Sequence, residues 1–334
     1  QTHLPPLGPL HASLSNLNGL PDTADWYRHG SLLTERLVGS SAATAPELLL
    51  TSNPAMARRI YHLYLPVYYF MRGCVRAHRA AGHTGAVGVG ISAPQGCGKT
   101  TLVELLVELF AADSLGCAAA SIDDFYLTGA EQDALATSHP SNPLLQVRGN
   151  AGTHDLPLGT QVLRALKQGE AHKELRIPRY DKAARSGRGD RAPTSSWPIA
   201  PVADIVLMEG WMFGFEPLVE AQIAGDEVLK TRAGLSEVNA RLAEYEVWNL
   251  LMDAWVVLAV DDVSCVYDWR LQAERAMAAA GRPGMSDRQV ADFVSRYMPA
   301  YEAYLPGLYA AGDAGGVGGK PTLMVRIDAT RNPI

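Results

Sequence analysis

Five short apolar segments recur along the chain and predict buried β-strands. Each is four to six residues long, and none alternates regularly with polar positions. Strands with this pattern are buried on both faces, as in a parallel sheet. A glycine-rich run at 312–319 predicts a loop before the last of them. The predicted strands are 87–92, 118–122, 205–208, 255–260 and 323–327.

Amphipathic patterns between these segments predict helices. Leu102 to Phe110 carries leucines and a phenylalanine at the spacing of one helical face. A second apolar stripe runs from Val290 to Tyr297, and a capping-box pattern starts before it at Ser286. Strands that alternate with helices indicate an α/β fold, in which helices cover both faces of a parallel sheet.

The patterns divide the chain into three parts. Residues 1–20 are polar and contain prolines, and we expect a flexible arm there. Residues 21–84 predict a helical N-terminal layer, in which Pro66 marks a kink or a new helix start. Residues 85–334 hold all five predicted strands, with a polar and basic insertion at about 126–200 where a substrate pocket is expected.

Composition excludes several classes of function. The chain has 334 residues, of which 47% are hydrophobic and 19% charged, and this balance is typical of a globular protein. Its net charge of −6 lacks the basic excess of a nucleic-acid binder. No apolar run reaches the roughly 18 residues of a membrane span. We therefore expect neither nucleic acid nor membrane as a partner, and no pattern indicates an oligomeric state.

A glycine-containing loop follows the first predicted strand and opens the first predicted helix. It matches the Walker A arrangement, with Ala93 where glycine is usual. Its glycines let successive N–H groups converge on an anion, and the helix N-terminus adds the positive end of its dipole. Lys99 can reach the β- and γ-phosphates of ATP, and Thr100 can ligate Mg²⁺. The predicted nucleotide-binding residues are Ala93, Pro94, Gln95, Gly96, Cys97, Gly98, Lys99, Thr100 and Thr101.

Cys97 allows two interpretations. A thiol at a helix N-terminus can have a lowered pKa and react readily, which would suit redox control. The alternative is a small residue that fills the loop. The chain has four cysteines and none is in a CxxC pair, so neither a zinc site nor a disulfide framework is indicated.

Acidic residues follow the second and third predicted strands. Ligands of open parallel sheets lie outside the carboxyl ends of the strands. Asp123 is therefore expected to face the γ-phosphate, to accept the proton of an attacking hydroxyl and to contact Mg²⁺, directly or through water. Asp124 is the alternative base, although it also suits a loop cap. Glu209 ends the third strand, and we expect it to hold Mg²⁺ in the Walker B role.

Motifs that the sequence lacks reduce the number of nucleotide-binding classes to which the chain could belong. No NKxD segment exists, and no strand ends in Asp-Glu, so guanine-specific switches and motor ATPases are disfavoured. A small-molecule kinase fits best. Two alternatives stay open: a kinase for another hydroxyl compound, such as pantothenate or a nucleoside, and a non-catalytic nucleotide-binding regulator.

Several longer motifs carry a resemblance to a known family. Together with the Walker A loop, they resemble plant-type D-glycerate 3-kinase, which belongs with phosphoribulokinase, uridine kinase and pantothenate kinase. The resemblance covers roughly residues 60–334, and no function is carried over to the segment before it. The motifs are NPLLQVRG from Asn142, GTHDL from Gly152, IPRYDK from Ile177, GRGDR from Gly187, EGWM from Glu209, WRLQAE from Trp269 and RYMPAY from Arg296.

The resemblance implies a fold, a reaction and a compartment. It implies a P-loop NTPase-type sheet, which we expect in the strand order 2-3-1-4-5, and a mobile lid at about 264–285. The implied reaction is transfer of the γ-phosphoryl group of ATP to D-glycerate, giving 3-phosphoglycerate at the close of photorespiration. Asp123 is the implied base, and Arg270 the implied lid arginine. A chloroplast stroma location follows from the family, and a cytoplasmic one is the alternative. A start at Gln1 instead of Met is compatible with removal of a targeting peptide.

Glycerate also predicts the chemistry of its pocket. A carboxylate suits a bidentate arginine, and hydroxyls suit neutral donors and acceptors. Lys182 could serve either group. The predicted catalytic residues are Asp123, Lys99 and Arg270, and the predicted substrate residues are Tyr126, Arg148, His154, Tyr180, Lys182, Arg188 and Arg191.

Overall fold

The structure is a computed structural model that describes most of the chain. The described residues are 22–39, 49, 52–168, 175–226, 229–281 and 284–334, and the predicted arm at 1–20 lies outside them.

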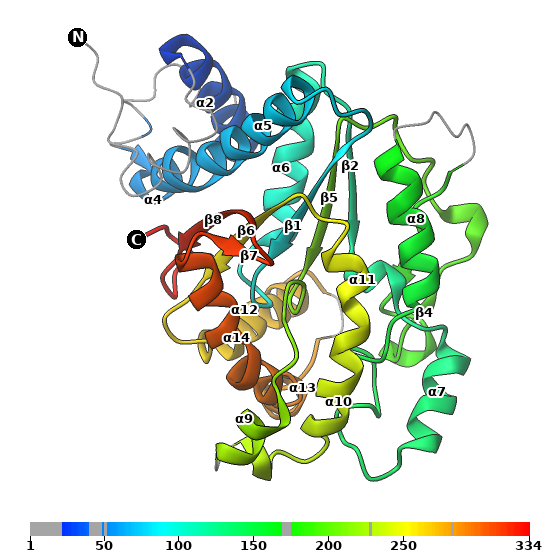
Figure 1. Cartoon of the computed structure of the whole chain (residues 1–334). Coiled ribbons are helices and arrows are strands. Elements are labelled where there is room, and N and C mark those ends of the chain that lie inside the picture. Colours follow the sequence, from blue (N-terminus) through cyan, green and yellow to red (C-terminus); the bar gives the residue numbers. More distant parts are fainter. Residues whose placement is uncertain (1–21, 40–48, 50–51, 169–174, 227–228, 282–283) are drawn as a thin grey trace.

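A twisted parallel sheet forms the centre of the molecule (Figure 1). Its strand order is β2-β5-β1-β6-β8-β7, and the first five are parallel neighbours. These five are the predicted strands in the predicted order, so the α/β fold with order 2-3-1-4-5 is confirmed. The strands are β1 (Val87–Ser92), β2 (Cys117–Ser121), β3 (Tyr180–Asp181), β4 (Asp190–Arg191), β5 (Ile205–Gly210), β6 (Ala254–Ala259), β7 (Gly316–Val317) and β8 (Lys320–Arg326).

Helices pack against the strands of the sheet. Helix α5 packs against β1 and β6, α8 against β5, and α14 against β6 and β8. The strands β1 and β6 are buried along their whole length, as expected for a sheet covered on both faces. The helices are α2 (Thr23–Val38), α4 (Pro54–Arg59), α5 (Leu65–Ala80), α6 (Lys99–Ala112), α7 (Gly129–Ser138), α8 (Leu156–Gln168), α9 (Glu220–Gly225), α10 (Leu235–Leu242), α11 (Glu246–Asn249), α12 (Cys265–Ala279), α13 (Asp287–Ser295) and α14 (Met298–Asp313).

Both predicted amphipathic helices form as their patterns indicate. In α6 every apolar residue of the stripe from Leu102 to Phe110 is buried. In α13 the hydroxyl of Ser286 accepts from the N–H of Gln289, whose side chain accepts from the Ser286 N–H. Among the described helices, none is long and apolar enough to cross a membrane.

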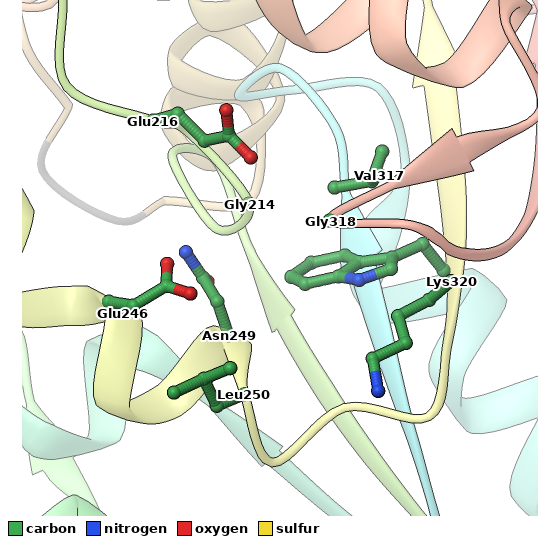
Figure 2. A pocket seen from close by; sticks show the side chains of 9 residues that line it. Gly214, Glu216, Glu246, Asn249, Leu250, Val317, Gly318 and Lys320 are labelled. Atoms are coloured by element: carbon green, nitrogen blue, oxygen red, sulfur yellow. The ribbon is translucent and has the colours of Figure 1, made fainter.

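The glycine-rich run differs from the predicted loop. Helix α14 continues to Asp313, and the remaining glycines form the hairpin of β7 and β8. Gly318 and Gly319 both have positive φ, at 57° and 71°, which a two-residue hairpin turn requires. The hairpin lines a small hollow together with Trp255 and the end of α11 (Figure 2). None of the predicted site residues lines that hollow.

The N-terminal helices join the core of the sheet domain. Trp26 and Leu33 of α2 are fully buried, and they belong to the same apolar cluster as Phe110 of α6. The chain passes through a π-helical turn, Ile60–Tyr64, directly before α5, so Pro66 lies in the first turn of a new helix as predicted. The layer therefore adds to one continuous core.

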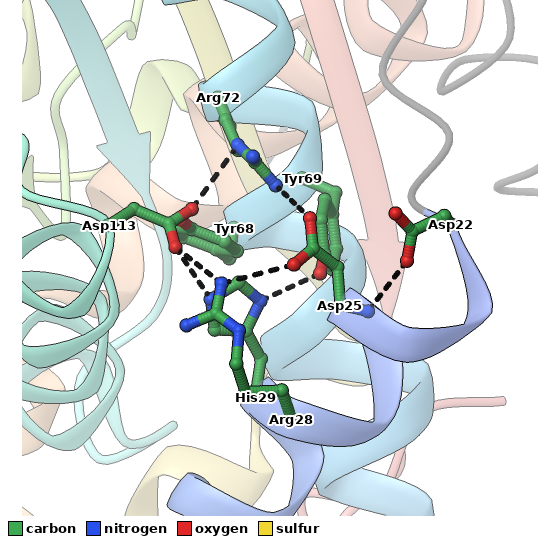
Figure 3. Close-up of polar contacts among 8 residues, drawn as sticks. All are labelled: Asp22, Asp25, Arg28, His29, Tyr68, Tyr69, Arg72 and Asp113. Atoms are coloured by element: carbon green, nitrogen blue, oxygen red, sulfur yellow. Dashed lines mark hydrogen bonds and ion pairs between the residues drawn. The ribbon is translucent and has the colours of Figure 1, made fainter.

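Asp113 joins this layer to the end of α6 (Figure 3). Its carboxylate accepts from Arg28 at 2.7 Å, contacts His29 at 3.0 Å and also accepts from the Tyr68 hydroxyl. Burial favours the neutral acid, but the hydrogen bonds from Arg28 and Tyr68 outweigh it and lower the pKa of Asp113 to about 2. The C-terminal end of the phosphate-loop helix is thereby tied to α2 and α5.

Candidate active site

The phosphate loop connects β1 to α6 through two glycines with positive φ. Gly96 has a φ of 82° and Gly98, the N-cap of α6, a φ of 100°. Other residues rarely adopt these angles, so both glycines are needed for the curl of the backbone. A Cβ on Gly96 would also lie 2.7 Å from the Cβ of Trp269, which packs closely on the loop.

The Lys99 side chain reaches back to the first residues of this loop. Its Nζ donates to the carbonyl oxygens of Ala93 and Pro94, each at 3.0 Å. Thr100 and Thr101 follow in the first turn of α6 and are exposed. The cation and both hydroxyls are therefore placed where a phosphate chain would meet the helix N-terminus.

Glu209 lies in β5, between the ends of β2 and β1. Its sheet neighbours are Ser121 on one side and Ile91 on the other. Its Oε2 is buried and accepts no hydrogen bond from the part of the chain that the structure describes. Burial raises the pKa of Glu209, and the nearby Lys99 ammonium opposes this shift. A buried oxygen that lacks a partner beside a phosphate loop is suited to a cation or a water bound to it.

Asp123 and Asp124 share a 3-10 turn after β2, but their partners differ. The Asp124 carboxylate accepts from the N–H of Ser121 at 3.1 Å and pairs with Arg179 at 3.2 Å. Asp124 therefore caps the loop, the second of the two roles considered for it from the sequence. The Asp123 carboxylate instead lies 2.6 Å from the Nζ of Lys182. Although burial opposes ionisation, this ammonium lowers the pKa of Asp123 and keeps it a carboxylate.

Aromatic side chains of the insertion gather beside Asp123. The ring of Tyr126 stacks on His154 with centroids 4.5 Å apart, and Tyr180 meets Tyr126 edge-on at 5.2 Å. The Arg148 guanidinium lies over the Tyr180 ring at 5.5 Å. Residues from distant parts of the predicted insertion are thus brought together, as a substrate pocket requires.

His154 is held in one orientation by Tyr245. The Tyr245 hydroxyl accepts from the N–H of Gly152 at 3.0 Å and lies 2.6 Å from Nδ1 of His154. Because the Tyr245 oxygen accepts from Gly152, its own proton can be donated to Nδ1 of His154. Nδ1 is then an acceptor, and we assign the proton of the neutral ring to Nε2. Burial lowers the pKa of His154 to about 4, so the imidazole is neutral near pH 7. Its buried Nε2 has no hydrogen-bond partner within the described residues, and it can serve as a neutral donor.

The three predicted arginines of the insertion have different surroundings. Arg148 donates to the carbonyl of Gly187 at 3.0 Å, which holds its guanidinium beside the tyrosines. Arg191 donates to the Tyr126 carbonyl and pairs with Asp155 at 2.9 Å, so it holds the Tyr126 backbone in place. Arg188 instead pairs with Asp133 of α7 at 2.6 Å on the exposed surface. This geometry does not support Arg188 as a substrate ligand.

Arg270 projects from α12, in the predicted lid. It pairs with the buried Glu274 at 2.6 Å, and its guanidinium lies over the Phe293 ring at 4.8 Å. The Glu274 carboxylate also accepts from the N–H of Met285 at 2.8 Å. The arginine is therefore oriented by two neighbours before any ligand is considered.

Tyr297 and Tyr301 are site residues that the sequence reasoning did not single out. The Tyr301 hydroxyl accepts from the N–H of Gln95 in the phosphate loop at 3.0 Å. Trp211 packs edge-on against both tyrosine rings, at 5.1 and 5.0 Å. The signal was present in the segment that begins at Arg296, where the two tyrosines are spaced by one helical turn.

Cys97 does not have the surroundings that the reactive-thiol interpretation requires. Its side chain is 5% exposed, and burial raises its pKa, while Lys99 only partly opposes the shift. Desolvation of a thiolate outweighs the helix dipole here. All four cysteines are free thiols. The structure therefore favours the alternative in which Cys97 fills the loop.

Comparison with known proteins places this geometry in a family. No family model matches the chain. The chloroplastic D-glycerate 3-kinase of Arabidopsis thaliana is 47% identical over 283 residues, which are 83% of this chain and 61% of that protein. An uncharacterized kinase of Schizosaccharomyces pombe, mug58, is 42% identical over 65% of this chain and 80% of its own length.

A solved structure agrees with these relatives. D-glycerate 3-kinase from Cryptococcus neoformans superposes with a TM-score of 0.70 at 34% identity, covering 80% of this chain and 96% of that one. The chain spans less than two thirds of the Arabidopsis relative, but nearly all of the fungal structure. With the phosphate loop, the acidic strand ends and the strand order already in place, this similarity shows that the chain belongs to the D-glycerate 3-kinase family of P-loop kinases.

Proposed function

We propose that this protein transfers the γ-phosphoryl group of MgATP to the 3-hydroxyl of D-glycerate, releasing ADP and 3-phosphoglycerate. The observation that carries the proposal is the placement of Asp123 and Glu209. Asp123 follows the carboxyl end of β2, and Glu209 lies near the carboxyl end of β5, the strand next to β1 and its phosphate loop. A pure nucleotide sensor has no need of a carboxylate that faces an acceptor, whereas a kinase does.

The nucleotide end of the site follows from the loop. Backbone N–H groups of 96–101 and the Lys99 ammonium bind the β- and γ-phosphates. The residues fit Mg²⁺, because Thr100 offers an exposed hydroxyl and Glu209 an unpaired buried oxygen. No group of three or more His, Cys, Asp or Glu in the described part of the chain could hold a metal by itself. This suits Mg²⁺, which takes most of its ligands from phosphates and water. When bound, Mg²⁺ would neutralise the charge on the transferred phosphoryl group.

The acceptor end follows from the contacts of Asp123. Its carboxylate accepts the proton of the 3-hydroxyl as that oxygen attacks the γ-phosphorus in line. Its low pKa makes it a weak base, which suits a loose transition state in which the proton leaves late. In this proposal Asp123 would also hold a metal-bound water.

The glycerate carboxylate needs positive charge, and two groups supply it. Lys182 lies 2.6 Å from Asp123, and Arg148 is held beside Tyr180. His154, Tyr126 and Tyr180 present neutral polar groups for the 2-hydroxyl, and Nε2 of His154 and the Tyr180 hydroxyl have no partner among the described residues. Arg191 acts indirectly, since it holds the Tyr126 backbone.

Arg270 completes the site from the lid. Its guanidinium would cover the phosphates and stabilise the charge that is transferred. The family also supports a place in photorespiration and a location in the chloroplast stroma, with the cytoplasm as the alternative. Immunodetection in isolated plastids and in the cytosolic fraction separates these two compartments.

An acceptor panel tests the proposal. Purified protein with MgATP is offered D-glycerate, L-glycerate, uridine and pantothenate, while ADP release and ³¹P spectra are recorded. We expect turnover of D-glycerate and a 3-phosphate product. Turnover of uridine or pantothenate in place of glycerate would identify the other kinase. ATP binding without turnover of any acceptor would favour a regulator.

A further inference from the structure

A short C-terminal segment, 328–332, lies against the phosphate loop, and we call it the C-terminal hook. The Asp328 carboxylate accepts from the N–H of Thr330 at 2.8 Å and from the N–H of Asn332 at 2.9 Å. Arg331 has a positive φ of 66°, which few non-glycine residues adopt. Its N–H donates to the Asp328 carbonyl at 2.8 Å. Several hydrogen bonds thus hold a backbone conformation that an isolated chain would rarely sample.

The hook directs the Arg331 side chain between the phosphate loop and α12. Its Nε donates to the carbonyl of Gly96 at 2.6 Å, and its Nη1 donates to the Gln272 side chain at 2.9 Å. The guanidinium lies over the Trp269 ring at 4.9 Å, and the indole N–H donates to the Ala329 carbonyl at 2.7 Å. The planar Arg331 guanidinium therefore joins the phosphate loop to α12, the helix that carries Arg270.

This contact fixes the direction of a peptide group in the phosphate loop. The Gly96–Cys97 bond is trans, since the described chain has no cis peptide. In a planar trans peptide the C=O and N–H point in opposite directions. Because the Gly96 carbonyl is held outward by Arg331, the Cys97 N–H is directed to the inner side of the loop. There it donates to the Pro94 carbonyl across a long distance of 3.4 Å.

A second arginine supports the hook from the N-terminal layer. Arg59 of α4 donates through Nε to the Asn332 side chain at 3.0 Å and through Nη2 to the Thr330 carbonyl at 2.6 Å. The hydrogen bonds of Arg59 and Arg331 within the described residues go to carbonyl and side-chain amide oxygens, not to carboxylates. Both therefore keep their positive charge unneutralised near the loop, which favours a polyphosphate.

We propose that Arg59 and Arg331 form a brace by which the N-terminal layer positions the phosphate loop for nucleotide binding. Both are positioning residues: Arg331 acts on the Gly96–Cys97 peptide, and Arg59 acts through the hook. The inference rests on the nucleotide half of the proposed function alone. It gives the helices before the sheet a part in the reaction beyond stability.

Direct binding of MgADP tests the brace without any acceptor, so a wrong acceptor assignment would not affect the result. Titration calorimetry compares the native protein with Arg331→Met, Arg59→Met, the double variant and Arg36→Gln. Arg36 is the matched control, because it too joins the N-terminal layer to the rest through an exposed pair, with Glu108. Loss of the charge-assisted contact to Gly96 should weaken MgADP binding roughly tenfold in Arg331→Met. Arg59→Met should weaken it less, and Arg36→Gln should bind as the native protein does.

The double variant tests the order of the two residues. If Arg59 acts through the hook, the double variant binds no more weakly than Arg331→Met, because the two effects are coupled. Effects that multiply, or an Arg331→Met variant with native affinity, would overturn the proposal. An Arg36→Gln loss as large as that of Arg59→Met would do the same, since any weakening of the layer would then suffice.

A kinetic comparison separates positioning from charge. Arg331→Lys keeps the cation but lacks the planar guanidinium that reaches Gly96 and Gln272 from two nitrogens, so it should restore only part of the affinity. In turnover assays the KM for ATP should rise in both arginine variants, while the KM for the acceptor stays native. Full restoration by lysine, or an equal rise in both KM values, would contradict a positioning role.

Discussion

Asp123 and Asp124 are adjacent in the chain and share one turn after β2, yet their carboxylates have separate partners. Arg179 and a backbone N–H occupy Asp124, whereas Asp123 is contacted by the exposed Lys182 ammonium and by the Tyr126 hydroxyl. The Lys182 side chain is 60% exposed, so in the proposed reaction it would have room to move to the substrate anion and leave Asp123 to the hydroxyl. At this scale, what a residue can do depends on which of its atoms are already bonded.

Lys99 should be needed for both binding and rate. Replacing it with alanine removes the only side-chain cation that the described phosphate loop contributes. We expect Lys99→Ala to weaken MgATP binding and to lower kcat together, since in the proposed reaction the ammonium would contact the group that gains charge. Calorimetry and initial rates measure the two effects. A native rate would remove its assigned role.

Tyr245 should act through His154. In Tyr245→Phe, Nδ1 loses its donor, and the ring is free to exchange tautomers or rotate. We expect the KM for D-glycerate to rise roughly fivefold, the value of one ordinary hydrogen bond, with the KM for ATP unchanged. Tyr304→Phe is the matched control, because the buried Tyr304 hydroxyl has no partner in the described structure. Equal effects of the two variants would argue against the assignment.

The phosphate loop works as an element because its backbone is held from several sides. Tyr301 binds the N–H of Gln95, Arg331 binds the carbonyl of Gly96, and Trp269 packs on Gly96. These holders come from the last third of the chain. The loop is therefore arranged before nucleotide binds, which reduces the ordering that binding must supply.

Gly96→Ala should damage this element. A side chain there faces both a positive φ and a contact of 2.7 Å with Trp269. We expect weaker MgADP binding and a lower Tm, because the strained backbone alone disfavours alanine by about 1–2 kcal/mol. Gly307→Ala is the control, since this helical glycine has open space around it and alanine favours helix. A Gly96→Ala variant with native nucleotide affinity would contradict the account of the loop.

Much of this architecture could be predicted from the sequence, because local patterns report local structure. Apolar runs gave the five parallel strands, and Gly96, Gly98 and Lys99 gave the phosphate loop. Long-range contacts carry no such pattern. Nothing near Arg331 in the chain indicates that it meets Gly96, and Tyr245 lies 91 positions from His154. Cys97 shows the same limit, since the burial that raises its pKa comes from distant segments.

At the scale of the whole molecule, the N-terminal layer and the sheet domain share one apolar core and the polar contacts around Asp113. Asp113 ends the helix that begins at the phosphate loop, and it is bonded to α2 and α5. The hook provides a second connection near the loop itself. The two ends of α6 are thus both connected to the N-terminal helices.

Asp113 should make stability depend on pH in the acid range. Its pKa is about 2 in the folded protein against 3.8 ordinarily, so the unfolded chain binds the proton more readily. Its contribution, on the order of 2 kcal/mol, is therefore present above pH 4 and lost as the pH falls towards 2. Urea unfolding of Asp113→Asn should differ most from native at neutral pH. A difference that stays constant down to pH 2 would exclude this linkage.

The central claim is that Asp123 activates an acceptor hydroxyl for attack on a nucleotide that the neighbouring loop holds. Its most direct test is the turnover of D-glycerate with MgATP by Asp123→Asn, beside Asp124→Asn and with MgATP binding measured in each. We predict that Asp123→Asn loses activity by about 10²–10⁴-fold while its MgATP affinity stays native. Asp124→Asn should lose stability but retain most of its kcat. Retained turnover in Asp123→Asn would contradict the account.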